Sequence, residues 1–204
     1  MFWDDNGLLN AYKDEKYGEN SLLYTLEYLL ITNDPSINEL LLSAIDRSQI
    51  SDGLYRQHPT NTDQMAHDQL TAIVCYFYKI KDSRLEIIWK EILKQNYHYD
   101  IITPNKPEKL LHPRDVIYYG CLVGNKWAQL LSPLLVVMMV FTLLGKKEDT
   151  SGKLLWWTRV MSLRGKIKKW LFLKIAPLLM RQSFKEVFAF YFKDTAHPIN
   201  RVYK

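Results

Sequence analysis

Hydrophobic residues recur along the first part of the chain at helical spacing. Residues 21–31 are apolar on nearly every face, which predicts a buried helix. Residues 36–48 carry a single apolar stripe, which predicts a helix with one buried face. Asn33, Asp34 and Pro35 separate the two segments and predict a break followed by a new helix start. The stripe consists of Ile37, Leu40, Leu41, Ala44 and Ile45.

The same alternation continues to residue 95. The polar residues 61–64 offer capping side chains for a helix that runs to about Lys79. Its predicted inner face is Met65, Leu70, Ile73, Val74 and Phe77. A further helix reaching about Gln95 is predicted from Leu85, Ile88, Trp89 and Ile92. The proline-containing stretch 96–113 is predicted to be a long loop, of a length that is uncommon unless the loop has a function.

The second half repeats the pattern. Residues 114–123 are predicted to be helical, with Gly124 and Asn125 as the end of that helix. A very apolar helix is predicted within 127–144, starting near Ser132 and Pro133. The last predicted helices are 151–163, 164–180 and 183–193.

No segment alternates with a period of two for long, so no sheet is expected. Paired helices joined by short loops predict an all-α fold of antiparallel helical hairpins, with a toroid-like or partial-toroid arrangement. The length fits a single domain over 1–204. Within it we expect a hairpin body, 1–144, with a C-terminal section, 145–204, packed on it.

Charge divides the chain at the same place. Residues 145–204 hold 14 Lys and Arg against 4 Asp and Glu, a balance of +10, so the total of +5 leaves −5 for 1–144. The basic section is also rich in aromatic residues. This pattern predicts a contact surface for other proteins over 153–193. A membrane-surface role for the tryptophan-rich part 153–180, or a nucleic-acid face, is the alternative.

Several classes of protein are disfavoured by the sequence. Two cysteines, Cys75 and Cys121, exclude a disulfide scaffold, and both are expected to be buried thiols. The polar N-terminus predicts no secretory signal. The uncharged apolar run 130–145 is shorter than the roughly 20 residues that span a bilayer, so no transmembrane span is expected. No phosphate-binding glycine loop is present, and we expect no cofactor.

The densest group of polar residues lies in the first third. On an enzymatic interpretation, Glu27 and Asp68 are the acid and base carboxylates and His67 carries a proton. The substrate-binding candidates are Tyr55, Arg56, His58, Asp63 and Gln64. Helical spacing would place Asp63 beside His67 and Gln64 beside Asp68. The alternative is a buried polar network in which Arg56 or His67 pairs with Glu27, because an unpaired buried charge is costly. No metal-ligand spacing such as HExxH is present, and no metal is expected.

Two motifs carry a resemblance to known proteins. Residues 19–28, Glu-Asn-Ser-Leu-Leu-Tyr-Thr-Leu-Glu-Tyr, resemble the opening motif of a set of helical phage-borne proteins. Residues 52–59, Asp-Gly-Leu-Tyr-Arg-Gln-His-Pro, followed by Asp63 and His67-Asp68, resemble their second motif. The resemblance covers about 19–70. It implies a relation to (α/α)-toroid proteins, whose known members include glycan hydrolases and lyases.

This chain departs from that pattern. Ser21 stands where the pattern has glycine, and His67-Asp68-Gln69 replaces paired acids. We therefore expect a phage or phage-derived structural or accessory protein, in the virion or the host cytoplasm, that assembles with other proteins without catalysis. The alternatives are a polysaccharide hydrolase or lyase, with a bound glycan, and a membrane-active protein.

Overall fold

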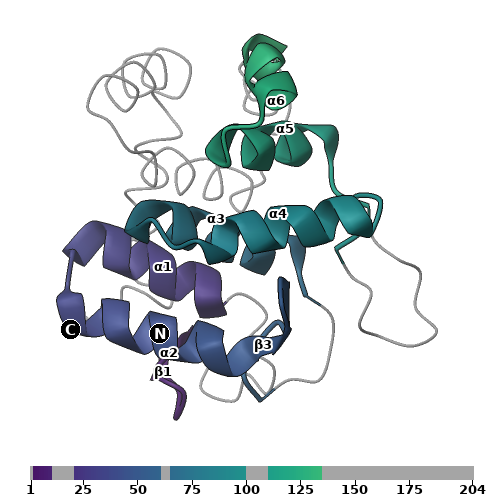
Figure 1. The fold of residues 1–204 in the computed structure, drawn as a ribbon. Coiled ribbons are helices and arrows are strands. Elements are labelled where there is room, and N and C mark those ends of the chain that lie inside the picture. The colour runs from purple at the N-terminus through teal and green to yellow at the C-terminus, as the bar shows by residue number, and fades with distance from the viewer. Residues whose placement is uncertain (1, 11–20, 61–64, 100–109, 135–204) are drawn as a thin grey trace, which may run out of the picture.

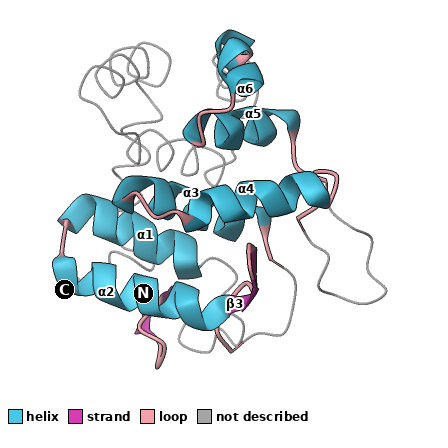
Figure 2. Ribbon diagram, viewed as in Figure 1, coloured by secondary structure: helices cyan, strands magenta, loops and turns pink. Residues whose placement is uncertain are grey.

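The computed structural model describes residues 2–10, 21–60, 65–99 and 110–134, and it is mostly helical (Figures 1 and 2). This confirms the predicted all-α character, whereas the toroid-like arrangement stays a prediction. The helices are α1 (Ser21–Thr32), α2 (Pro35–Ser48), α3 (His67–Ile80), α4 (Arg84–Lys94), α5 (Pro113–Leu122) and α6 (Lys126–Leu130). The strands are β1 (Phe2–Trp3), β2 (Leu9–Asn10), β3 (Gln49–Ser51) and β4 (Leu54–Tyr55). The predicted helices after residue 150 lie outside the described residues.

Consecutive helices pack in pairs, α1 with α2, α3 with α4 and α5 with α6 (Figure 1). The first pair is joined where Asn33 adopts a left-handed φ of 54° and Asp34 caps α2 by accepting the backbone N–H of Ser36. Pro35 occupies the first turn of α2, so the helix begins one residue before its predicted start at residue 36. On the predicted stripe of α2, four residues are buried, but Leu40 is exposed.

The third helix is the centre of the described core. Every residue from Gln69 to Phe77 is buried, because α3 packs against both α1 and α4. Arg84 closes the turn between α3 and α4. Its guanidinium forms ion pairs with Asp82 and Asp46 and lies 4.4 Å above the ring of Phe77. The salt bridge to Asp82 raises the pKa of Arg84 further above its already high ordinary value.

The last described pair stands on the far side of α3 and α4 from α1 and α2 (Figure 1). Gly124, with φ of +77°, makes the turn after α5, which agrees with its predicted place at the helix end. Asn125 then caps α6 by accepting the N–H of Ala128 at 3.1 Å. The apolar helix predicted to start near Ser132 and Pro133 agrees with the helical residues 132–134, but the short helix α6 before it was not predicted as a separate element. The part after residue 134 lies outside the described residues.

The expectation of no sheet is wrong, since two small antiparallel hairpins are present. In the first, β1 pairs with β2. In the second, β3 pairs with β4 around the two-residue turn Asp52-Gly53. Gly53 has φ of +79°, and a side chain there would meet Glu91 Cβ at 2.9 Å. Strands of two or three residues are too short to show alternation, so the Asp-Gly turn was the only local signal.

The predicted start of α3 is also wrong. The helix begins at His67, and Ala66 precedes it with an extended backbone (φ −75°, ψ 147°) and no side-chain cap. Met65 lies before the helix, and its side chain is buried in the core. Because the chain at Ala66 is not helical, the helical spacing that would place Asp63 beside His67 does not apply. Among the described segments, no helix has both the length and the apolarity needed to cross a bilayer.

Candidate functional site

Among the predicted site residues, His67 contacts a carboxylate with each of its two ring nitrogens. It is the first residue of α3, and both of its ring nitrogens face carboxylates. Nδ1 lies 3.1 Å from Asp68 Oδ1, and Nε2 lies 2.7 Å from Asp115 Oδ2. The second contact joins α3 to α5 across 48 residues of sequence. Sequence analysis did not single out Asp115.

Asp115 is fully buried in the first turn of α5. A carboxylate in that turn interacts favourably with the positive end of the helix dipole. Arg114 Nε lies 3.7 Å from Asp115 Oδ2, so the buried carboxylate has two cationic neighbours when His67 is protonated. A buried carboxylate requires such partners because its desolvation is costly.

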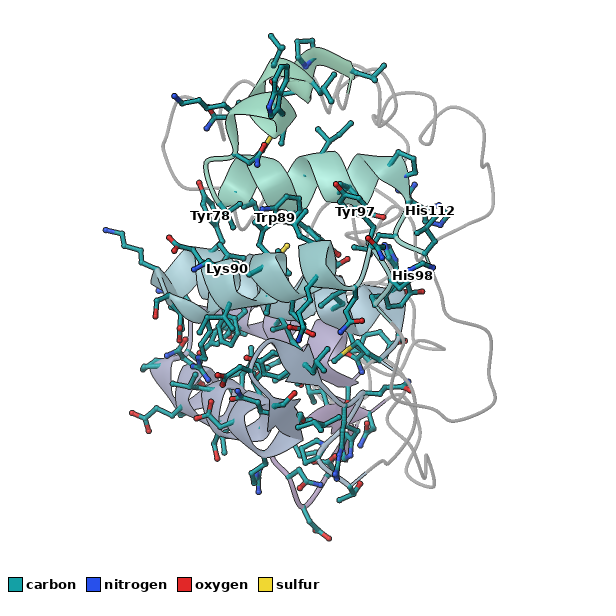
Figure 3. All side chains as sticks on the ribbon, turned by 45° about the vertical axis from the view of Figure 1, so that its right-hand side comes forward. Tyr78, Trp89, Lys90, Tyr97, His98 and His112 are labelled. Carbon is teal, nitrogen blue, oxygen red and sulfur yellow. The ribbon has the colours of Figure 1, made fainter. Side chains whose placement is uncertain are left out.

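Two rings lie next to His67. The rings of His112 and Tyr99 lie edge-on to it, with centroids at 5.8 Å and 6.2 Å. Figure 3 shows His112 together with Tyr97 and His98 at one end of α4 and α5. The site is therefore a partly covered imidazole held between two carboxylates. A general base needs a ring nitrogen free to accept a proton from substrate, and each nitrogen of His67 already faces a carboxylate.

A second histidine makes a separate contact. His58 Nε2 lies 2.7 Å from Asp4 Oδ2, and its Nδ1 lies 2.7 Å from the Thr60 hydroxyl. Asp4 also accepts hydrogen bonds from the backbone N–H of Leu8 and the side chain of Asn10. His58 was predicted to bind substrate, whereas in the structure it fastens the N-terminal hairpin to the loop after β4.

Asp4 gives the fold a pH dependence. Its burial favours the neutral acid, but hydrogen bonds from His58, Leu8 and Asn10 outweigh that effect and lower the pKa of Asp4. A carboxyl whose pKa is lowered in the folded state stabilises the fold at neutral pH, and this contribution is lost as the pH falls through the folded pKa. We expect Asp4→Asn to be less stable than wild type at about pH 6, with a smaller difference at about pH 3.

Urea denaturation at the two pH values measures this difference. Asp5→Asn is the matched control, because Asp5 is the exposed neighbour on the same hairpin. If Asp4→Asn and Asp5→Asn give the same difference from wild type at both pH values, the Asp4–His58 contact does not contribute to stability.

Further polar side chains connect the helices inside the core. Gln69, on α3, is fully buried. It accepts the N–H of Leu23 from the first turn of α1 at 3.1 Å and donates to the carbonyl of Gln57 at 3.2 Å. The hydroxyls of Thr71 and Tyr119 lie 2.7 Å apart and join α3 to α5. These bonds satisfy groups whose burial would otherwise be unfavourable.

The other predicted site residues are distributed over different elements. Glu27 is fully buried in the middle of α1, with no exposed surface for a substrate to reach. Tyr55 is buried on β4 against the ring of Phe77, and burial raises its pKa to about 12. Arg56 is half-buried, and its backbone N–H donates to the Ser48 carbonyl at 2.7 Å. Asp63 and Gln64 lie outside the described residues.

A hollow lies between the β3–β4 hairpin and α4, with about 320 Å³ of empty space when the solvent at its opening is included. Its polar lining includes Glu91, Gln95 and His98, and its apolar lining includes Leu70, Ile88 and Ile92. The Tyr55 hydroxyl has no hydrogen-bond partner among the described residues, and the ring lines this hollow. No three His, Cys, Asp or Glu side chains within the described ranges are placed to hold a metal ion.

The contacts of His67 could be anticipated only in part. Asp68 is its neighbour in the sequence, and their contact needs no long-range information. Asp115, in the first turn of α5, and Asp4, in the turn between β1 and β2, are both far from their histidines along the chain. Comparisons with family models, with characterised proteins and with solved structures found no match to this chain.

Proposed function

We propose that this chain is a structural or accessory protein, of the phage-borne kind that residues 19–70 resemble, and that it assembles with other proteins without catalysis. The observation that supports this proposal best is the state of His67. Both ring nitrogens face carboxylates, and one of these, Asp115, is fully buried. An imidazole held in this way joins two helices and offers no free nitrogen to a reacting group.

The placement of Glu27 supports the same conclusion. An acid catalyst of a glycan-active enzyme must reach the glycosidic oxygen, and two carboxylates must flank the bond that breaks. Glu27 has no exposed surface, whereas Asp68 is partly exposed at the start of α3. A buried Glu27 and a Gln69 that binds two backbone groups are typical of a network that maintains the fold.

The assembly surface proposed here is the basic, aromatic section 153–193, which lies outside the described residues. Its positive charge complements the acidic partner surfaces that such a section attracts. The body of the molecule would then serve as the rigid support that presents this section.

Glu27→Gln tests the proposal. We expect the wild-type protein to release no reducing ends or unsaturated sugars from a panel of bacterial polysaccharides. We expect Glu27→Gln to lower the free energy of unfolding by roughly 1–3 kcal/mol, because it alters a buried, partnered group. Thermal melting followed by circular dichroism measures the second effect.

The opposite result would support the alternative. If the wild type degrades a polysaccharide, and Glu27→Gln keeps the wild-type melting temperature but loses that activity, the chain is a glycan-active enzyme.

Sedimentation velocity of the full chain tests assembly. We expect a species larger than the 24.2 kDa monomer, and the double charge reversal Lys166→Glu/Lys168→Glu should return it to the monomer. A wild type that remains monomeric at all concentrations contradicts self-assembly.

A further inference from the structure

The two contacts of His67 determine how many protons this cluster holds. Nδ1 lies 3.1 Å from Asp68 Oδ1, and Nε2 lies 2.7 Å from Asp115 Oδ2. A neutral imidazole carries one N–H, so it donates to only one of two ionised carboxylates. An imidazolium has an N–H on each nitrogen and donates to both. The geometry of both contacts therefore requires one proton more than a neutral ring and two carboxylates contain.

The charges that face His67 favour the imidazolium. Asp68 contributes a negative charge from α3 and Asp115 contributes one from α5. The described cation closest to this pair is Arg114, whose Nε lies 3.7 Å from the same Asp115 oxygen, beyond hydrogen-bond distance. The rings of His112 and Tyr99 lie edge-on to His67, and a protonated His112 would act against the imidazolium as Arg114 does. Two adjacent carboxylates outweigh one more distant guanidinium.

Solvent reaches one side of this cluster and not the other. The side chain of His67 is 17% exposed, so its proton can exchange with water, whereas that of Asp115 is fully buried. After the proton leaves, the remaining N–H can donate to Asp115, because Asp68 is 26% exposed and can bind water instead. The bond to Asp115 then has a neutral donor. Such a bond is roughly half as strong as one from a charged donor, and the buried carboxylate loses a compensating charge.

Other contacts limit how far this change extends along α5. The hydroxyls of Thr71 and Tyr119 lie 2.7 Å apart, and Ile117 is buried in the core, so the later turns of α5 stay attached to α3 without the proton. Asp115 lies in the first turn of α5. The proton on His67 therefore controls the attachment of that first turn.

We propose that His67 is a proton-dependent latch, which holds the first turn of α5 on α3 and weakens as the pH rises. This goes beyond the structural role proposed above, because it names a condition that controls the packing of α5. The folded cluster binds a proton more tightly than the unfolded chain does. The stabilisation is therefore present at mildly acidic pH and is lost as the pH rises. The Asp4 carboxyl acts in the opposite direction, since its contribution is lost as the pH falls.

Nitrogen NMR of the imidazoles in the full-length wild type tests the proton count directly. At about pH 7.5, one unit above the ordinary histidine pKa of about 6.5, we expect His67 to carry a proton on both ring nitrogens. Urea denaturation between about pH 6 and about pH 9 tests the consequence. We expect the unfolding constant of the wild type, relative to that of His67→Gln, to rise at least about tenfold over this range.

Two further variants locate the effect. Asp115→Asn places an amide oxygen beside Nε2, which can accept from a neutral ring, so we expect this variant to lose most of the pH dependence. His112→Gln is the matched control, because it removes the exposed neighbouring histidine. We expect it to keep the pH dependence of the wild type. Melting curves show whether each variant has folded.

Any of three results would overturn the proposal. The first is a wild-type His67 with a proton on only one ring nitrogen at about pH 7.5, which needs no variant to be observed. The second is a constant ratio between the unfolding constants of the wild type and His67→Gln across the pH range. The third is a pH dependence that survives Asp115→Asn or disappears in His112→Gln, since the proton would then act elsewhere.

Discussion

Asp115→Ala is expected to lower the free energy of unfolding by roughly 3 kcal/mol, because it leaves His67 and Arg114 without the buried carboxylate that both approach. Asp115 has no exposed surface, so water cannot replace the missing partner without opening the contact between α3 and α5. Urea denaturation near neutral pH measures this loss.

Asp68→Ala is the matched control for Asp115→Ala. Asp68 faces the other nitrogen of the same histidine, but 26% of its side chain is exposed. Water and salt weaken an ion pair at such a position, so we expect a loss below about 1 kcal/mol. Equal losses for the two variants would show that burial does not distinguish the two carboxylates and that α3 and α5 are not held together by Asp115.

Gly120→Ala is the second substitution with a large expected effect. An added Cβ at Gly120 would lie 2.5 Å from the Cβ of Ala128 and 3.3 Å from Cη2 of Trp89. Alanine is ordinarily better than glycine inside a helix by up to about 1 kcal/mol, so only the clash can make this change unfavourable. We expect a net loss of roughly 1–3 kcal/mol from overpacking.

The reciprocal change provides the control. Ala128→Gly removes the atom that an alanine at position 120 would meet, so the double variant Gly120→Ala/Ala128→Gly should be more stable than Gly120→Ala. A coupling free energy of at least about 1 kcal/mol between the two sites is expected from urea denaturation. Coupling near zero would mean that α5 and α6 do not approach each other as closely as the structure places them.

The helices could be predicted from the sequence because their signals are local. The break at Asn33 to Pro35 and the turn at Gly124 depend only on nearby residues, and the structure has both features where they were predicted. The start of α3 was mispredicted because residues 61–64 look like caps. The core instead requires the side chain of Met65, which the extended backbone at Ala66 directs inward.

The contacts of the candidate site could not be predicted in the same way. The sequence singled out His67 and His58 as candidate site residues, but it gave no indication of the partners that they have in the structure. Their buried or half-buried partners, Asp115 and Asp4, are 48 and 54 residues away, so only the packing of whole helices brings them together. The β3–β4 hairpin could have been predicted from Asp52-Gly53, since that dipeptide suits a two-residue turn.

The contacts that hold the β1–β2 hairpin to the rest of the molecule also set an order in which they can form during synthesis of the chain. Leu9 binds the Thr25 hydroxyl of α1, and Asp4 binds His58. On a ribosome, Thr25 is added 16 residues after Leu9, whereas His58 is added 54 residues after Asp4. The contact between Asp4 and His58 can therefore form only after the polypeptide has been synthesised past residue 58.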